Sequence, residues 1–251
     1  MSLASNLRLS VVIPTADRGE AVRRTLGSVF GQSYRPFEVI LVDNGKVALD
    51  SAIIDLRASI IRTEPRIGPG RARNIGARTA KGNLIAFLDD DDLWQPSYLE
   101  HVVRNFERSS ADAVLGVLMR QPEKGEAYSY KHFPCKPEEQ RRVFYSNPGF
   151  GGQNLTIRRD VFIELGGFDE SLPASEDRDL AARLLIAGKK LISEPAAIAV
   201  LCDHGGARAR HSMLRGNWRF ITKHWRNMRI NELYMALSVL TKRYVLLLLG
   251  R

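Results

Sequence analysis

Short apolar runs, each stopped by a polar turn, recur through the first third of the chain and constrain its fold most strongly. They have the length and composition of buried strands, and they cover residues 9–13, 37–42, 59–63 and 84–88. Apolar residues at helical spacing lie between the first two runs, at 17–31. Residues 68–80, which begin with Gly-Pro-Gly and end near Gly82, also look helical. This alternation predicts an α/β fold with a mostly parallel sheet and helices on both faces.

Polar turns follow three of the predicted strands, after Ile13, Val42 and Leu88. The carboxyl ends of parallel strands lie at one edge of a sheet, and ligands bind beyond that edge. We therefore expect the three turns to converge on one crevice.

The second half of the sequence is less regular. Residues 120–148 are polar and contain prolines, which is typical of a long excursion or mobile loop. We expect strands at 112–119 and 154–157, and helices at 96–108, 175–188 and 211–249.

The charge balance favours an anionic partner. The chain has 37 Lys and Arg against 28 Asp and Glu, a net charge of +9. Residues 204–231 contain seven Lys or Arg and no Asp or Glu.

The cysteines and the apolar runs indicate the cellular compartment of the protein. Cys135 and Cys202 lie far apart and have no zinc-site spacing, which favours free thiols in a reducing environment. The sequence opens without an apolar segment of signal-peptide length, and no run approaches the length of a membrane span. We expect a cytoplasmic protein.

Four consecutive aspartates, Asp89 to Asp92, follow the predicted strand at 84–88. Four like charges are hard to keep ionised without a cation or solvent screening. Mg²⁺ and Mn²⁺ prefer oxygen ligands, so an Asp-x-Asp here can join the protein to a diphosphate through a metal. The alternative is a solvated acidic turn in which Asp92 caps the helix that begins near Pro96.

Glu176 and Asp177 open a predicted helix shortly after the run at 166–170. A carboxylate there could act as a general base toward an acceptor hydroxyl. The alternative is a purely structural role, since acidic residues stabilise the first turn of a helix.

Five motifs occur in a fixed order along the chain. They are Ser10-Val-Val-Ile-Pro-Thr15, Val42-Asp-Asn-Gly45, Ala72-Arg-Asn-Ile-Gly76, Phe87-Leu-Asp-Asp-Asp-Asp92, and Gly166-Gly-Phe-Asp-Glu170 with Glu176-Asp177. Together they resemble the family 2 glycosyltransferases, which have the GT-A fold, a Rossmann-type α/β architecture. The resemblance implies transfer of a sugar from a nucleotide-diphosphate donor to an acceptor hydroxyl, with inversion, in glycan or cell-surface polysaccharide biosynthesis.

The resemblance also implies roles for individual residues. Asp177 would be the general base with Glu176 beside it, and Asp91 would be the main ligand of a divalent metal, Mn²⁺ or Mg²⁺, with Asp89 contributing. We expect one in-line displacement, in which the base takes the acceptor's proton and the metal stabilises the departing diphosphate. The donor site would comprise Pro14, Thr15, Asp17, Asp43, Asn44, Arg73, Asp89 and Asp90.

Two departures from the family's pattern bear on the donor and the product. The common Asp-Asp-Gly-Ser turn is Asp43-Asn44-Gly45-Lys46 here. Because Asn44 can both donate and accept hydrogen bonds, a UDP-sugar is favoured while another base stays open. The Gln-x-x-Arg-Trp motif of processive synthases is missing, which favours a single addition.

His204 and His211 flank a basic loop that contains Arg208 and Arg210. The resemblance implies a histidine near the metal or diphosphate, and the arginines could contact phosphate. The alternative is a surface loop with incidental histidines.

The C-terminal region combines Trp218 and Trp225 with basic residues and ends in an apolar tip at 244–249. It suits peripheral contact with the inner face of an anionic membrane, and thus a lipid-linked acceptor. The alternative is packing on the core or on a second subunit, as in a homodimer. We expect a catalytic domain over 1–203 and a basic loop with a helical extension over 204–251, packed on the same domain.

Two other functions are weighed against transfer. A sugar-nucleotide nucleotidyltransferase usually has a Gly-rich, Arg-containing loop after the first strand, where this chain has residues 14–18 without one. A basic nucleic-acid-binding protein would suit the net charge. The chain has no zinc-finger, RNP or helix-turn-helix signature, so no nucleic-acid partner is expected.

Overall fold

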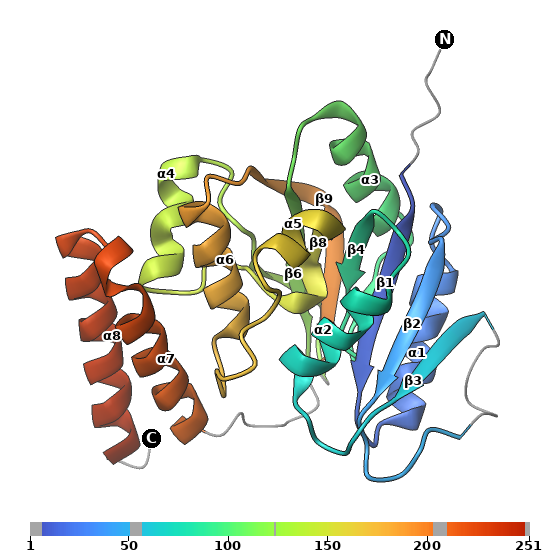
Figure 1. Ribbon diagram of the computed structural model, residues 1–251, viewed down its shortest axis with the longest axis horizontal. Coiled ribbons are helices and arrows are strands. Elements are labelled where there is room, and N and C mark those ends of the chain that lie inside the picture. Colours follow the sequence, from blue (N-terminus) through green and yellow to red (C-terminus); the bar gives the residue numbers. More distant parts are fainter. Residues whose placement is uncertain (1–6, 51–56, 123, 203–209, 249–251) are drawn as a thin grey trace.

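The computed structural model describes residues 7–50, 57–122, 124–202 and 210–248 (Figure 1). Its centre is a sheet with the strand order β3-β2-β1-β4-β8-β6-β9-β5, and β7 pairs with β6. The strands are β1 (Leu9–Thr15), β2 (Glu38–Asp43), β3 (Ala58–Arg62), β4 (Leu84–Phe87), β5 (Leu93–Trp94), β6 (Ala113–Gln121), β7 (Tyr128–Lys131), β8 (Leu155–Arg158) and β9 (Leu191–Cys202).

The N-terminal half of the sheet is entirely parallel. β1 pairs in parallel with β2 and β4, and β2 pairs in parallel with β3. β8 runs antiparallel to β4 and β6, and β9 runs parallel to β6. The predicted α/β fold, with strands at all four early apolar runs, is confirmed.

Helices cover both faces of the sheet (Figure 1). Successive side chains of a strand point to opposite faces, so Val11 and Ile13 of β1 pack in one apolar cluster and Val12 in another. The first cluster lies under α1 (Gly19–Phe30) and α3 (Tyr98–Arg108); the second lies under α2 (Pro69–Thr79), α5 (Arg159–Glu164) and α6 (Glu176–Ile186).

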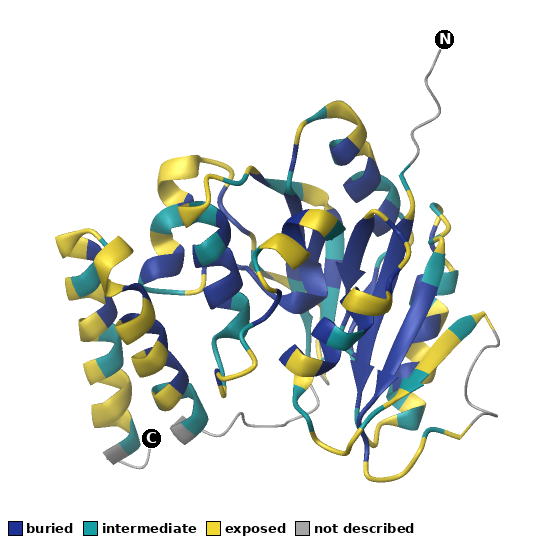
Figure 2. Ribbon diagram, in the orientation of Figure 1, coloured by how far each residue is buried: buried dark blue, intermediate teal, exposed yellow. Residues whose placement is uncertain are grey.

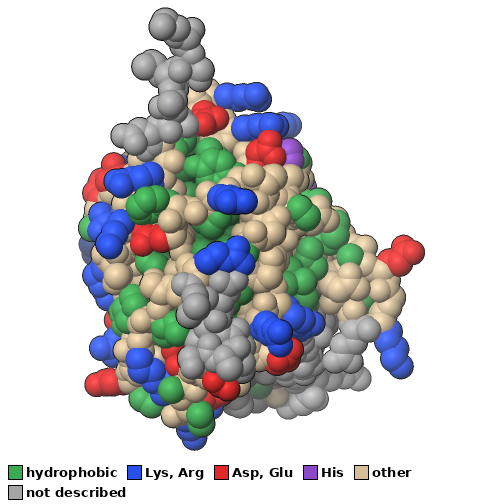
Figure 3. Space-filling view, turned by 90° about the vertical axis from the view of Figure 1, so that its right-hand side faces the viewer, with side chains coloured by type: hydrophobic (Ala, Val, Ile, Leu, Met, Phe, Trp, Pro, Cys, Tyr) green, Lys and Arg blue, Asp and Glu red, His purple; other side chains and the backbone are tan. Residues whose placement is uncertain are grey.

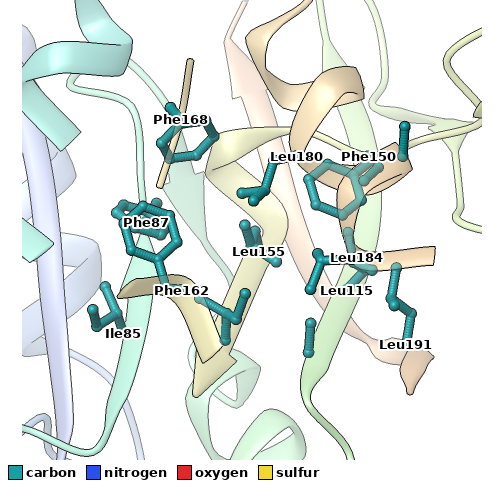
Figure 4. Packing of buried hydrophobic residues seen from close by; sticks show 14 of the residues in the cluster. Ile85, Phe87, Leu115, Phe150, Leu155, Phe162, Phe168, Leu180, Leu184 and Leu191 are labelled. Carbon is teal, nitrogen blue, oxygen red and sulfur yellow. The ribbon is translucent and has the colours of Figure 1, made fainter. Parts of the chain in front are cut away.

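Three aromatic rings join β4 to the layer of α5 and α6. The ring centroid of Phe87 lies 5.2 Å from that of Phe162 and 5.4 Å from that of Phe168 (Figure 4). This packing places the run at 166–170 beside the end of the strand that leads into the four aspartates.

α2 lies directly on β1 because Gly76 has no side chain. A Cβ at Gly76 would lie 2.4 Å from Cγ1 of Val12 and 3.1 Å from Cγ2 of Val42. This close approach fixes α2, and with it Arg73 and Asn74, relative to the strands.

The C-terminal helices α7 (Arg210–His224) and α8 (Ile230–Leu248) form a hairpin at the end of the molecule opposite β3 (Figure 1). Phe220 of α7 and Ala236 of α8 are buried in the core, whereas most of α8 is exposed or half-buried (Figure 2). Arg141 donates to both carboxylate oxygens of Glu232, at 2.7 and 2.6 Å. Within the described part of the chain, no helix has the length and apolar character needed to span a bilayer.

Residues 120–148, predicted as a long excursion or mobile loop, contain regular structure. Besides β7, this stretch forms α4 (Pro137–Gln140) and the 3-10 helix η2 (Arg141–Phe144). Phe133 and Val143 are fully buried, so isolated apolar residues among charged ones anchor the segment to the core.

β9 was not predicted from the sequence. Glu194 and Pro195 interrupt its apolar run, and the pairing of β9 with β6 shifts register between Gly116 and Val117. A Cβ at Gly116 would lie 2.5 Å from the carbonyl oxygen of Ala197. The irregularity thus accommodates the proline, as strand prolines require.

Candidate active site

The turns after β1, β2 and β4 meet at one edge of the sheet, as predicted. The backbone N–H and the side-chain Nδ2 of Asn44 both donate to the carbonyl oxygen of Thr15, at 2.9 and 2.8 Å. The N–H of Ala16 donates to Oδ2 of Asp90 at 3.4 Å. Pro14 and Thr15 are buried beneath these turns.

The buried carboxylate of Asp43 shapes the turn that follows β2. One oxygen accepts the N–H of Gly45 at 3.0 Å, and the other accepts the N–H of Leu49 at 2.9 Å. Arg62 lies 2.6 Å from the second oxygen. Both oxygens are therefore engaged within the turn.

Asp17 connects the turns after β1 and β2. Its backbone has a positive φ of 58°, and its Oδ1 accepts the N–H groups of Lys46 and Val47 at 2.7 and 3.1 Å. The hydrogen bond from Val47, supported by those from Lys46 and Arg66, holds the pKa of Asp17 below its usual value. The carboxylate therefore stays ionised while it joins the two turns.

The four aspartates alternate between partly exposed and buried positions. The side chains of Asp89 and Asp91 are 23% and 20% exposed, whereas Asp90 and Asp92 are buried. Arg18 contacts Asp91 and lies 3.1 Å from Asp90. The alternation selects Asp89 and Asp91 as the pair that can face a ligand.

Asp92 does not cap a helix, so that alternative is wrong. α3 begins at Tyr98 after Ser97, and Oδ1 of Asp92 instead accepts the N–H of Cys202 on β9 at 3.1 Å. Burial, with the nearby charges of Asp89 and Asp91, raises the pKa of Asp92 to about 8. Burial thus favours the neutral form of Asp92, which lessens the repulsion within the cluster.

Arg73 is the buried centre of the site. Its guanidinium contacts Asp89 and lies 3.8 Å from Oε1 of Glu176 and 4.0 Å from Oδ1 of Asp177. Burial opposes its charge, but the three carboxylates outweigh burial and raise the pKa of Arg73. Among the described residues, Nε and Nη1 of Arg73 are buried without a hydrogen-bond partner, so the three nearby carboxylates balance its charge through Coulomb attraction.

Gly152 gives Arg73 its space. A Cβ at Gly152 would lie 2.7 Å from Cζ of Arg73. The neighbouring carbonyl of Gln153 accepts Nε1 of Trp94 at 2.9 Å, which ties this segment to the chain just after the aspartates. Sequence reasoning missed Gly152, and only its place in a Gly-Gly pair hints at a close approach.

Asn74 fastens the run at 166–170 to α2. Its Nδ2 donates to the carbonyl of Phe168 at 2.8 Å, and its Oδ1 accepts the N–H of Phe168 at 2.8 Å. Nδ2 also lies 2.9 Å from Oε1 of Glu170. Adjacent residues of α2 therefore hold the aspartate cluster and the segment that leads to Glu176 and Asp177.

Two buried charges follow Asp177 on α6. Arg178 donates to the carbonyls of Val143 and Phe144 and to Oδ1 of Asn217, at 2.6, 2.8 and 2.8 Å. Burial lowers the pKa of Arg178 to about 9. The side chain stays charged at neutral pH and joins α6 to η2 and α7.

Asp179 is the second of these charges. Its oxygens accept Nε of Arg183 at 2.7 Å and lie 2.8 Å from Nε2 of His224 and from Nζ of Lys223. Burial would raise its pKa, but the hydrogen bond from His224 and the charges of Arg183 and Lys223 prevail and lower the pKa of Asp179 to about 2. Sequence reasoning named neither Arg178 nor Asp179, because only the tertiary fold buries them.

The described residues contain no group of three or more His, Cys, Asp or Glu that could hold a metal by themselves. Asp89 and Asp91 nevertheless suit Mg²⁺ or Mn²⁺, which often takes one or two carboxylates and completes its shell with substrate phosphates and water. His204 and Arg208 lie outside the described residues, as do the side chains of His211 and Arg210. Their predicted role in the site stays a prediction.

Solved structures share this fold. TarS from S. aureus, crystallised with UDP-GlcNAc, is 17% identical, with a TM-score of 0.68 over 95% of this chain and 72% of TarS. GalNAc-T7, crystallised with UDP, GalNAc and Mn²⁺, is 19% identical, with a TM-score of 0.68 over 86% of this chain and 48% of GalNAc-T7. These likenesses establish the GT-A architecture expected above.

Curated proteins that are similar in sequence include two bacterial glycosyltransferases. An uncharacterized glycosyltransferase of Haemophilus influenzae is 30% identical over 182 residues, which cover 70% of this chain and 62% of the relative. The putative colanic acid biosynthesis glycosyl transferase WcaA of Escherichia coli is 27% identical over 88% of this chain and 83% of WcaA. The chain thus spans less than two thirds of the Haemophilus relative's length.

The family model "Glycosyl transferase family 2" matches residues 10–166. The match includes the turns after β1, β2 and β4, together with Arg73, and ends before Glu176 and Asp177. It covers well over half of the sequence, so the chain belongs to glycosyl transferase family 2.

Proposed function

We propose that this protein transfers a sugar from a nucleotide-diphosphate donor to an acceptor hydroxyl. The observation that carries the proposal is the position of Arg73, whose guanidinium contacts Asp89 and lies within 4.0 Å of Glu176 and Asp177. A donor-side carboxylate and a candidate base are thereby held by one buried cation. A sugar transferase needs these two functions side by side.

The donor site lies at the turns after β1, β2 and β4, where Thr15, Asp17 and Asn44 meet. A UDP-sugar is the favoured donor, and the UDP-containing structures of TarS and GalNAc-T7 support this choice. The side-chain N–H₂ of Asn44 is used by Thr15, so its Oδ1 is the atom suited to accept the N3–H of uracil.

Asp89 and Asp91 would hold the divalent metal, Mn²⁺ or Mg²⁺, through their partly exposed carboxylates. When bound, the cation would neutralise charge on the departing diphosphate. The guanidinium of Arg18 contacts Asp91 and balances the negative charge of its carboxylate. The Mn²⁺ in the GalNAc-T7 structure supports this assignment.

The chemistry is an inverting displacement. Asp177 takes the proton of the acceptor hydroxyl as that oxygen bonds to the anomeric carbon. The bond between the anomeric carbon and the diphosphate oxygen breaks on the opposite face, and the electron pair leaves with the nucleoside diphosphate. Glu176 lies beside Asp177, and Arg73 supplies positive charge between the base and the donor side.

The acceptor is proposed to be a growing glycan carried on a lipid, with a single sugar added per cycle. Relatives named for colanic acid, succinoglycan and amylovoran biosynthesis support a polysaccharide pathway. Such an acceptor places the enzyme at the cytoplasmic side of a membrane. A nucleotidyltransferase would instead release pyrophosphate, so product analysis separates the two activities.

Thermal unfolding with nucleoside diphosphates tests the proposal directly. UDP with Mn²⁺ should raise the melting temperature by roughly 5–10 °C at about a hundred times its dissociation constant, and UDP without metal should raise it less. If no nucleoside diphosphate stabilises the protein at saturating Mn²⁺, the proposed function is wrong.

A further inference from the structure

The α7–α8 hairpin carries large apolar side chains that are exposed to solvent. Ile230 is 92% exposed, Tyr234 71%, Trp218 55% and Trp225 50%. Leu237 and Tyr244 are also exposed. We call these six residues and the basic residues among them the hairpin surface.

The apolar residues of α8 form a stripe distinct from its core-facing side. Ile230, Tyr234, Leu237 and Tyr244 follow one another at steps of four, three and seven residues, which places them on one side of a helix. The side that faces the core carries Glu232 and Ala236, both buried. The exposed stripe is therefore no extension of the core contact.

The exposed charged residues of the hairpin are all basic. Arg215, Arg219, Arg226, Arg229 and Lys242 are all exposed. Glu232 is the single acidic residue between 210 and 248, and it is buried against Arg141. On the face shown in Figure 3, by contrast, Lys and Arg are interspersed with Asp and Glu.

We propose that the hairpin surface binds an anionic lipid bilayer at the level of the headgroups. Trp and Tyr favour this interface because their rings are apolar and their N–H or O–H groups remain hydrated. Lys and Arg beside them attract anionic headgroups. A symmetric dimer through the same surface would bring like charges together without an exposed acidic partner, which disfavours a second copy as the occupant.

The inference rests on the proposed function in one respect: a lipid-linked acceptor would require the enzyme to work at a membrane. Vesicle binding tests it without any transfer reaction. The full chain should sediment with vesicles of equal parts phosphatidylcholine and phosphatidylglycerol, and bind phosphatidylcholine vesicles at least tenfold more weakly. Emission from Trp218 and Trp225 should shift to shorter wavelength, since the third tryptophan, Trp94, is already buried.

Matched variants separate the contributions of charge and apolar contact. Arg226→Gln with Arg229→Gln should weaken binding to anionic vesicles roughly tenfold to thirtyfold, whereas Arg23→Gln with Arg35→Gln should not. Ile230→Ser with Tyr234→Ser should remove the fluorescence shift. The control pair Ile163→Ser and Ile186→Ser replaces exposed apolar residues elsewhere, which are 43% and 47% exposed.

Three results would overturn the inference: no vesicle binding by the full chain, equal binding to neutral and anionic vesicles, or a dimer in sedimentation equilibrium that the Ile230/Tyr234 variant abolishes. Stabilisation of every variant by UDP with Mn²⁺ should match that of the parent protein. A loss of lipid binding with intact donor binding would therefore leave the proposed transferase activity standing.

Discussion

Nη1 of Arg73 lies 4.0 Å from Oδ1 of Asp177, and the same guanidinium contacts Asp89 on the far side of the site. Arg73→Gln keeps a hydrogen-bonding side chain but removes the charge that both carboxylates share. We expect kcat/KM to fall by about a hundredfold or more, as for loss of a preorganised charge-stabilising donor. Steady-state assays of nucleoside diphosphate release measure this loss.

Arg71→Gln is the control for that variant. Arg71 lies on the same helix, is half-exposed and is 3.7 Å from Glu170. Its replacement should change kcat/KM little. Equal losses in the two variants would show that charge on α2 in general, rather than Arg73, supports turnover.

Replacing the proposed base separates chemistry from binding. Asp177→Asn should reduce turnover by about a hundredfold to ten-thousandfold, the range of general acid–base contributions. Stabilisation by UDP with Mn²⁺ should be retained, because the donor turns are untouched. Turnover like that of the Glu164→Gln control would remove Asp177 from this role.

Arg18 would compete with the proposed metal for Asp91. Its guanidinium contacts Asp91, and its side chain is 53% exposed, so the contact is worth about 1 kcal/mol or less. Arg18→Gln should therefore tighten Mn²⁺ binding in the absence of nucleotide by about twofold to fivefold. Calorimetric titration with Mn²⁺ measures the change, and weaker binding than in an Arg23→Gln control would contradict it.

Acid should weaken the attachment of α7 to α6 through Asp179. The pKa of Asp179 is lowered to about 2 by its partners, chiefly His224, against burial. A lowered pKa stabilises the fold above the unfolded value of 3.8, and the stabilisation is lost as pH falls toward 2. The contribution is about 2 kcal/mol at pH 7, and roughly half of it remains at pH 3.

Urea unfolding of the parent and of Asp179→Asn measures this contribution. The difference in the free energy of unfolding should shrink by about 1 kcal/mol between pH 5 and pH 3. If the difference in the free energy of unfolding did not depend on pH, Asp179 would stabilise the fold through packing rather than through its charge.

The close approach of α2 to β1 gives a test based on volume. Gly76→Ala should destabilise the protein by about 1–3 kcal/mol, the usual cost of overpacking, because its Cβ would lie 2.4 Å from Cγ1 of Val12. Val12→Ala with Gly76→Ala should recover part of the loss relative to the sum of the single variants. Strict additivity in urea unfolding would contradict the contact.

Short apolar runs were enough to predict the parallel half of the sheet, because both faces of a strand such as β1 are buried. The meeting of Thr15, Asn44 and the aspartates followed from the rule on strand ends. The alternating exposure of Asp89 to Asp92 could not be predicted in this way, because Asp92 accepts a hydrogen bond from Cys202, 110 residues away. The local sequence does not predict β9 either, because Pro195 interrupts its apolar run. Pro195 fits into the strand only through the register shift opposite Gly116, which depends on the pairing of β9 with β6.

The same limit applies to the residues after Asp177. Asp179 is bound by side chains 44 and 45 residues further on, and in sequence it is one more acidic residue in a first helical turn. The resemblance to the family identified Asp177 but not the contacts of Asp179. Sequence spacing cannot predict these contacts, because Lys223 and His224 reach Asp179 only when α7 packs against α6.

Arg178 carries a consequence for chimeric enzymes. Its three acceptors come from η2 and from Asn217 of α7, and it directly follows the proposed base. Exchanging the C-terminal helices, or residues 120–148, with those of a relative would leave a buried guanidinium without part of its shell. The three non-contiguous segments should therefore be exchanged as one block, and single-segment swaps should lose turnover.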